Sequence, residues 1–334
     1  MLLHKMFFCL LIAFNISNSW AETENTFKPI IIYQGRVAEG SYQYLLDSGV
    51  KKFERISGHK VERVFIDRDL SQYILEVENA AKKNYSPIII QDSNVIEHFD
   101  AVVSKYPATK FISMDVSYEI PNVLGITFDH AKGAYIIGFL AGLKTKSNIV
   151  GFIGGIDIPV INEFECGYRV GLNDANPRAK LLTRYINTGT HSWEDTVSAN
   201  RISEELFAQN VDIIFPAAGL ASLTVIDTAK KYNLQAFGVD VDVSAQYPDT
   251  VLATLEKRSD SAIFAALMQI NNRVWNHNNK VFGMKQNVIN IKVNTLNPRL
   301  SQAEIGVIKQ LVGRMKGEDT LLYQKLNHYC AVNS

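Results

Sequence analysis

The run PIIIYQ occupies residues 29–34, and a similar run, PIIIQD, occupies residues 87–92. Both are continuous stretches of branched apolar residues rather than alternations of apolar and polar side chains. Such runs are typical of parallel strands that are covered on both faces of their sheet. Further strands are predicted at residues 61–66, 110–115, 123–128, 148–155, 180–186, 211–218, 234–242, 251–257 and 288–293.

Amphipathic stretches between these strands predict helices. Asp69 is a good N-cap for a helix over 70–84, and Ser301 with Glu304 forms a capping box for a helix over 301–316. Most strands begin about 22–32 residues after the previous one, the length of a strand–helix unit. The alternation predicts an α/β protein with parallel sheets. The other predicted helices cover residues 130–146, 199–209 and 259–277.

The order of the strands predicts two lobes, each with its own sheet. We expect the first five strands to form one sheet and the strands between residues 148 and 242 to form the other. Lobe 1 would then comprise residues 22–128 and 258–293. Lobe 2 would comprise residues 129–257 and 294–334.

The composition is that of a globular protein without a charge bias. Hydrophobic residues make up 47% of the 334 residues, and 34 Lys and Arg balance 34 Asp and Glu. The zero net charge argues against a basic nucleic-acid-binding surface. The cysteines and histidines show no spacing typical of structural zinc. Cys166 and Cys330 lie far apart in the chain, and we expect two buried thiols there rather than a disulfide, although pairing stays open.

The first 21 residues have the layout of a secretory signal peptide. His4 and Lys5 precede an apolar run at residues 6–14, and Ser19-Trp20-Ala21 offers small residues before a cleavage point. The run is shorter than the roughly 20 residues that span a bilayer. No cysteine follows it directly, so we expect a freely diffusing periplasmic protein without a lipid anchor. The alternative is a buried N-terminal helix.

Polar residues recur where the predicted strands end. Ligands of such folds bind beyond the carboxyl ends of parallel strands, so these residues are candidates for a binding site. The alternative is that each is a loop residue or a helix cap. Aromatic residues that could stack on a flat ligand are Tyr42, Trp193 and Phe215, for which core packing is the alternative. The strand-end residues are Gln34, Gln91, Asp92, Asp115, Gly219, Asp240 and Asp242.

No motif in the sequence indicates an enzyme. Residues 151–155 (GFIGG) lack the glycine spacing of a dinucleotide site and of a phosphate loop, and no G-x-S-x-G elbow occurs. Asp240 and Asp242 alone are a weak metal signal, because no third ligand lies nearby. Nothing in these patterns positively suggests an enzyme, and no cofactor is predicted.

Residues 150–171 (VGFIGGIDIPVINEFECGYRVG) closely resemble the signature of the basic membrane protein family of solute-binding proteins, which includes purine nucleoside receptors of ATP-driven importers. The resemblance extends to residues 128–142, 214–230 and 237–258. It implies a type I periplasmic-binding-protein fold, with two Rossmann-like lobes joined by three crossings.

The resemblance also implies roles for individual residues. Tyr42 and Phe215 would stack on the base of a nucleoside. Asp115 matches an acid that follows the fourth strand, Asp240 matches a ribose-binding Asp, and Lys257 falls at a Lys near the cleft.

The sequence departs from the family where it approaches the first helix. Gln34, Glu39 and Gln43 stand where the family places Asp, Asp and Asn. The loss of a base-binding acid predicts weaker discrimination among bases.

The resulting hypothesis is a secreted, monomeric protein that binds a nucleoside, with purine nucleosides as the leading candidates, and delivers it to the permease of an ABC importer. One alternative is a sensor that presents a bound small molecule to a membrane receptor. A nucleoside hydrolase is the enzymatic alternative.

Overall fold

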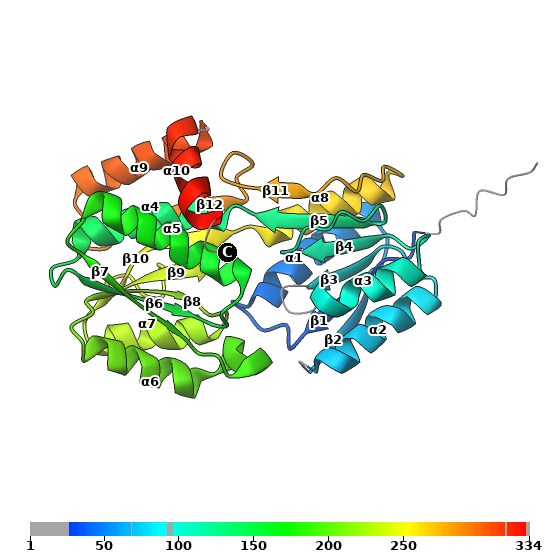
Figure 1. Cartoon of the computed structure of the whole chain (residues 1–334), viewed down its shortest axis with the longest axis horizontal. Coiled ribbons are helices and arrows are strands. Elements are labelled where there is room, and N and C mark those ends of the chain that lie inside the picture. The colour runs from blue at the N-terminus through cyan, green and yellow to red at the C-terminus, as the bar shows by residue number, and fades with distance from the viewer. Residues whose placement is uncertain (1–26, 68, 92–95, 318, 332–334) are drawn as a thin grey trace, which may run out of the picture.

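The computed structural model describes residues 27–331, except residues 68, 92–95 and 318. Within this part of the chain the elements form two lobes that lie side by side, each a six-stranded sheet with helices packed on it (Figure 1). The expected signal peptide and the candidate residue Asp92 lie outside the described residues. In the described part, no helix is long and apolar enough to cross a membrane.

Lobe 1 contains an entirely parallel sheet. Side chains of the strand next to one edge, β1 (Ile30–Gln34), alternate between two cores. Ile31 and Tyr33 face the cluster that includes residues of the helix Tyr42–Ser57, whereas Ile30 and Ile32 face the cluster with residues of the next two helices along the chain. The strand order is β11 (Lys280–Phe282), β5 (Val123–Phe128), β4 (Phe111–Met114), β3 (Ile88–Gln91), β1 (Ile30–Gln34) and β2 (Glu62–Ile66). The helices are α1 (Tyr42–Ser57), α2 (Leu70–Lys82), α3 (Ile96–Lys105) and α8 (Ser259–Asn271).

Lobe 2 contains a mixed sheet, in which only β12 runs antiparallel to its neighbour. The strand order is β12 (Ile289–Val293), β10 (Val251–Lys257), β9 (Gln235–Asp240), β8 (Ile213–Ala217), β6 (Ile149–Gly154) and β7 (Lys180–Tyr185). The helices are α4 (His130–Lys144), α5 (Pro159–Ala175), the short 3₁₀ helix η1 (Gly189–Glu194), α6 (Thr196–Phe207), α7 (Ala221–Lys231), α9 (Gln302–Lys316) and α10 (Thr320–Ala331).

The two-sheet prediction is confirmed, but one strand was assigned to the wrong lobe. The first five strands share a sheet, and the four strands β6 to β9 share the other. The strand predicted at 288–293 pairs with β10 in lobe 2, not with lobe 1. Its place at the edge of lobe 1 is taken by β11, a three-residue strand that the sequence pattern did not reveal.

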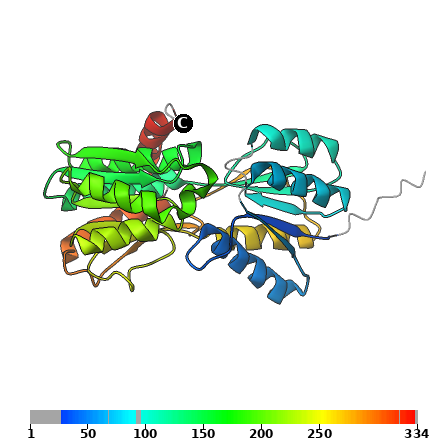
Figure 2. The ribbon, with the colours of Figure 1, turned by 90° about the horizontal axis from the view of Figure 1, so that it is seen from below.

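The chain crosses between the lobes three times, after β5, after β10 and between β11 and β12. Figure 2 shows these segments passing through the narrow region between the two lobes. The predicted capping box at Ser301 and Glu304 is present at the start of α9.

Helices α4 and α5 of lobe 2 pack unusually closely. A Cβ on Gly171 would overlap the carbonyl oxygen of Tyr135, and a Cβ on Gly138 would overlap that of Tyr168. Only glycine permits this approach of two helix backbones.

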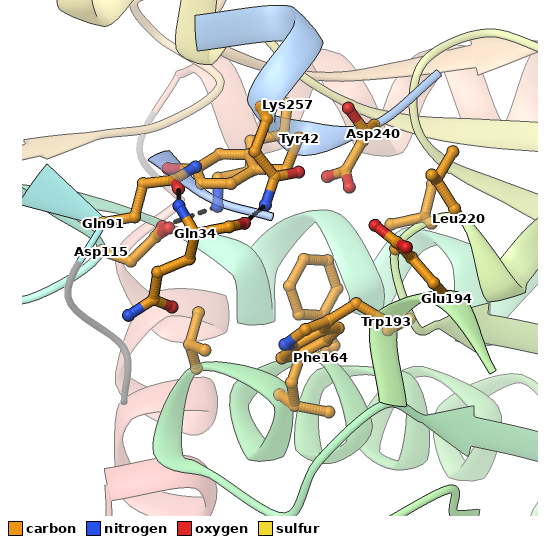
Figure 3. Close-up of a pocket in the computed structure, with 17 residues that line it drawn as sticks. Gln34, Tyr42, Gln91, Asp115, Phe164, Trp193, Glu194, Leu220, Asp240 and Lys257 are labelled. Carbon is orange, nitrogen blue, oxygen red and sulfur yellow. Dashed lines mark hydrogen bonds and ion pairs between the residues drawn. The ribbon is translucent and has the colours of Figure 1, made fainter. Parts of the chain in front are cut away.

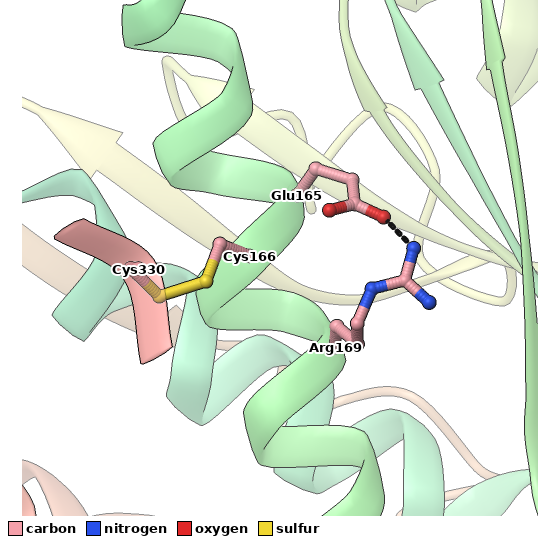
Figure 4. Close-up of a disulfide and its surroundings, with 4 residues drawn as sticks. All are labelled: Glu165, Cys166, Arg169 and Cys330. Carbon is pink, nitrogen blue, oxygen red and sulfur yellow. Dashed lines mark hydrogen bonds and ion pairs between the residues drawn. A yellow bond between two sulfur atoms is a disulfide. The ribbon is translucent and has the colours of Figure 1, made fainter. Parts of the chain in front are cut away.

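Cys166 of α5 and Cys330 of α10 form a disulfide, with their Cα atoms 5.6 Å apart (Figure 4). The prediction of two separate thiols is therefore wrong. The two residues are 164 positions apart, and the contact arises because α10 folds back onto α5. The bond attaches the C-terminal helix to the body of lobe 2.

Candidate ligand-binding site

A pocket lies between the lobes, at the carboxyl ends of strands from both sheets (Figure 3). Lobe 1 supplies the last residues of β1 and β3, the residue after β4 and the start of α1. Lobe 2 supplies the ends of β8, β9 and β10, the start of α5 and the 3₁₀ helix η1. The lining residues are Gln34, Ser41, Tyr42, Gln43, Gln91, Asp115, Val160, Ile161, Phe164, Trp193, Glu194, Ala217, Gly219, Leu220, Val239, Asp240 and Lys257.

A buried ion pair joins the lobes at the centre of the pocket. Lys257 Nζ, from the last residue of β10, lies 2.6 Å from Asp115 Oδ1, directly after β4. The ammonium also lies 4.3 Å from the centre of the Tyr42 ring and 4.5 Å from that of Phe128. The carboxylate and the two rings together compensate the cost of burying the lysine charge.

Asp240 brings a second carboxylate into the pocket. It ends β9 with a left-handed backbone (φ 64°), which turns the chain sharply at the strand end. Burial raises the pKa of Asp240 to about 6; Lys257 opposes this rise and Asp115 adds to it. No hydrogen bond from the described residues holds this carboxylate, so it is available as an acceptor for a ligand.

Three neutral amides lie at the other end of the pocket. The backbone N–H of Gln34 donates to Gln91 Oε1 at 2.9 Å, and the Gln34 carbonyl accepts from Gln43 Nε2 at 2.8 Å. In Figure 3, Gln34 and Gln91 lie on one side of Lys257, whereas Asp240 and Glu194 lie on its other side. The pocket is therefore polar at both ends: Asp240 and Glu194 lie at one end, and the amides of Gln34 and Gln91 lie beside the ion-paired Asp115 at the other.

Aromatic rings from both lobes line the space between these ends. Tyr42 comes from the first position of α1 in lobe 1, and burial, together with the charge of Asp115, raises its pKa. Phe164 and Trp193 come from lobe 2. The backbone of Gly155 lies against the Trp193 indole, because an added Cβ would come within 2.5 Å of the ring.

A second titratable pair lies directly beside the pocket. His130 Nδ1 is 3.2 Å from Glu163 Oε2, and both residues line a smaller hollow that shares Asp115 with the pocket. Burial lowers the pKa of His130 to about 3. Burial and the charge of Asp115 raise the pKa of Glu163 to about 7. The imidazole is thus neutral at pH 7, and Glu163 is the group here that titrates near neutrality.

Residues 28–315 match the family described as ABC transporter substrate-binding protein PnrA-like. The chain belongs to this family. Basic membrane protein A of Borreliella burgdorferi strain B31 is 27% identical over 236 residues, which cover 69% of this chain and 68% of that protein.

Solved structures support the same fold. An ABC transporter solute-binding protein from Aeropyrum pernix K1 has a TM-score of 0.78 at 16% identity, covering 88% of this chain and 92% of that one. A transcriptional activator of the comK gene from Bacillus halodurans has a TM-score of 0.71 at 16% identity, covering 88% and 99%. The predicted type I periplasmic-binding-protein fold is confirmed.

PnrA-like proteins are solute-binding proteins of ABC transporters and not enzymes. Such proteins work outside the cytoplasmic membrane, bind a small ligand and have a transporter as partner. Among the described residues, no group of three or more His, Cys, Asp or Glu side chains could hold a metal ion.

The structure brings eight of the ten candidate residues to one pocket. They are Gln34, Tyr42, Gln43, Asp115, Trp193, Gly219, Asp240 and Lys257. Asp92 is outside the described residues. The roles of the eight pocket residues toward a ligand remain predictions.

Phe215 does not line the pocket, so the expectation that it stacks on a base is wrong. Its side chain is fully buried in the core of lobe 2, where its ring lies 5.3 Å from that of Tyr168 and 5.8 Å from that of Phe152. The wall contains Phe164 instead, whose ring is 6.3 Å from Phe215.

Sequence reasoning did not select Phe164 or Glu194, and it named Gln91 only as one of the strand-end candidates, without a specific role toward the ligand. Phe164 lies within the quoted family signature, but its helical position gave no hint of its direction. Gln91 was noted as a strand-end residue, which is the signal that could have identified it. Glu194 directly follows Trp193 in η1 and carried no recognisable pattern.

Proposed function

We propose that the protein captures a nucleoside in the interlobe pocket and delivers it to an ABC importer. Purine nucleosides are the leading candidates, as the family resemblance implies. The observation that carries the proposal is Asp240, a half-buried carboxylate with no hydrogen bond from the described residues, at one end of a pocket lined by aromatic rings.

Asp240 suits the ribose of a nucleoside. An ionised carboxylate accepts hydrogen bonds from both hydroxyls of a vicinal diol, and bonds to a charged group contribute roughly 1.5–3 kcal/mol each. Lys257 lies close enough to influence the charge of Asp240, which supports its ionised form.

Aromatic side chains suit the base. Tyr42 from lobe 1 and Phe164 with Trp193 from lobe 2 supply ring faces to the same space. Stacking contributes roughly 0.5–1.5 kcal/mol per ring pair beyond the burial of area, and it tolerates different bases.

Contacts between the lobes support a closing motion around the ligand. Besides the central pair of Asp115 and Lys257, Arg36 of lobe 1 lies 3.5 Å from Glu194 of lobe 2. A ligand that touches both lobes would favour this closed arrangement, and the altered outer surface would be what the permease recognises.

The proposal includes export to the periplasm through a signal peptide at residues 1–21, with a mature chain that starts near Glu22, carries no lipid and is monomeric. The N-terminal apolar run and the small residues before Glu22 support it. N-terminal sequencing of secreted protein that found an intact Met1 would contradict it.

Calorimetry tests the nucleoside role directly. Adenosine should bind more tightly than 2′,3′-dideoxyadenosine by roughly 1.5–3 kcal/mol or more, since the latter lacks the hydroxyls that Asp240 would accept. Mass spectrometry of the ligand released from denatured protein should identify a nucleoside. Equal affinities for both compounds would show that the diol role is wrong.

A further inference from the structure

The main chain of Gln34 fixes the orientation of two side-chain amides at the end of the pocket opposite Asp240. Its N–H donates to Gln91 Oε1, and its carbonyl accepts from Gln43 Nε2 (Figure 3). Because a backbone N–H only donates and a carbonyl only accepts, neither amide can be turned over without losing its bond. Gln91 must therefore present its nitrogen elsewhere, and Gln43 must present its oxygen.

The side-chain nitrogen of Gln91 has no partner among the described residues. Gln91 is only 5% exposed, and its Nε2 atom is buried without a hydrogen bond. The residue is also held firmly, because its backbone N–H donates to the Tyr73 hydroxyl, which in turn donates to the carbonyl of Ile32. Buried polar groups of native proteins nearly always have a partner, and an unsatisfied one costs about 1–3 kcal/mol.

We propose that Gln91 donates a hydrogen bond from Nε2 to an acceptor on the bound ligand. The pocket then selects a neutral ring ligand whose polar edge carries a carbonyl oxygen or an unprotonated ring nitrogen. Gln43 Oε1 offers an acceptor for a neighbouring donor on the same edge. The inference rests on the nucleoside-binding function proposed above, and it assigns the base edge to the amide end, opposite Asp240.

The chemistry of this end differs from that of a carboxylate. A carboxylate accepts two hydrogen bonds and favours an edge with two donors, whereas this amide pair offers one donor and one acceptor. Together with Gln91, the two residues that depart from the family pattern, Gln34 and Gln43, thus take part in recognising the ligand.

The substitution Gln91→Glu tests the proposal. It keeps the size of the side chain and an oxygen that accepts from the Gln34 N–H, but it replaces the unpaired donor with an acceptor. We expect the dissociation constant for inosine, measured by calorimetry at pH 7.5, to rise roughly 5- to 150-fold. The exposed Gln302→Glu adds the same charge on lobe 2 and should leave it unchanged. Wild-type affinity in Gln91→Glu would overturn the proposal, because Gln91 would then only hold Gln34 in place.

Ligand analogues test it without any variant. Purine riboside lacks the 6-oxo acceptor and the N1–H donor of inosine and has an unprotonated N1 instead, whereas the 1-, 3- and 7-deaza forms of adenosine each remove one ring-nitrogen acceptor. At least one analogue should bind the wild type tenfold or more weakly than its parent nucleoside. Equal binding of all four would overturn the role of Gln91 while leaving the nucleoside function intact. Failure of every nucleoside to bind would overturn both.

Discussion

Acidification should weaken ligand binding, because Asp240 must be ionised to accept hydrogen bonds from two hydroxyls. Burial places its pKa at about 6, so the group titrates within an accessible pH range. A ligand that binds the carboxylate competes with its protonation, and affinity must fall as the pH drops through 6.

The size of the effect follows from the pKa. At pH 7.5 nearly all molecules carry the ionised group, whereas at pH 5.0 only about one in ten does. The dissociation constant for adenosine should therefore rise about tenfold between these two values, which corresponds to about 1.4 kcal/mol. Calorimetry in buffers of constant ionic strength measures the change.

Two variants separate Asp240 from its neighbours. Asp240→Asn should bind weakly and lose this pH dependence. Glu163, with a pKa of about 7, titrates in the same range, and Glu163→Gln should leave the transition near pH 6 in place. A wild-type affinity that stays constant from pH 7.5 to pH 5.0 would refute the role of an ionised Asp240.

The stability of the unliganded protein should respond in the opposite direction. The folded-state pKa of Asp240 lies above its ordinary value of 3.8, so the folded protein binds this proton more readily than the unfolded chain. Above pH 6 the ionised Asp240 lowers the free energy of unfolding, and this destabilisation diminishes as the pH falls toward 4. The wild type should thus be less stable than Asp240→Asn at pH 7.5, and the free energies of unfolding of the two proteins should become similar at pH 4.

Three further predictions concern the disulfide, the aromatic residues and the base. Replacing Cys166 and Cys330 together by alanine should lower the free energy of unfolding by about 2–5 kcal/mol, measured by denaturant titration, and unchanged stability would count against a structural role. Phe215→Ala should cost about 3–5 kcal/mol of stability as a core truncation, whereas Phe164→Ala should mainly weaken adenosine binding; the reverse pattern would contradict their placement. Affinities for adenosine, guanosine, inosine, uridine and cytidine should span less than about 3 kcal/mol, roughly 150-fold, and a thousandfold preference for one purine would reject this expectation.

The sequence predicted the sheets and the edge that carries the pocket because both depend on local pattern. Continuous apolar runs reveal buried parallel strands, and the residue at the end of such a strand must lie at the edge of the sheet. Asp115 and Asp240 were found in this way, and both adopt left-handed backbone conformations there.

Contacts between distant segments could not be predicted in this way. Phe215 is the third residue of β8, and its side chain points into a core shared with α5 rather than out of the sheet edge. The pairing of Cys166 with Cys330 depends on how α10 returns to α5, and the lobe of β12 depends on where the chain makes its last crossing. The local sequence pattern indicates neither of these two paths of the chain.

The position of Trp193 makes the protein a spectroscopic reporter of its own occupancy. The sequence holds three tryptophans, and Trp20 belongs to the expected signal peptide. Of the other two, Trp193 lines the pocket, whereas Trp275 lies in lobe 1, where its indole donates to the carbonyl of Pro121. A nucleoside in the pocket would thus alter the emission of one indole while the other supplies a constant reference. Fluorescence titration can therefore follow binding without a dye.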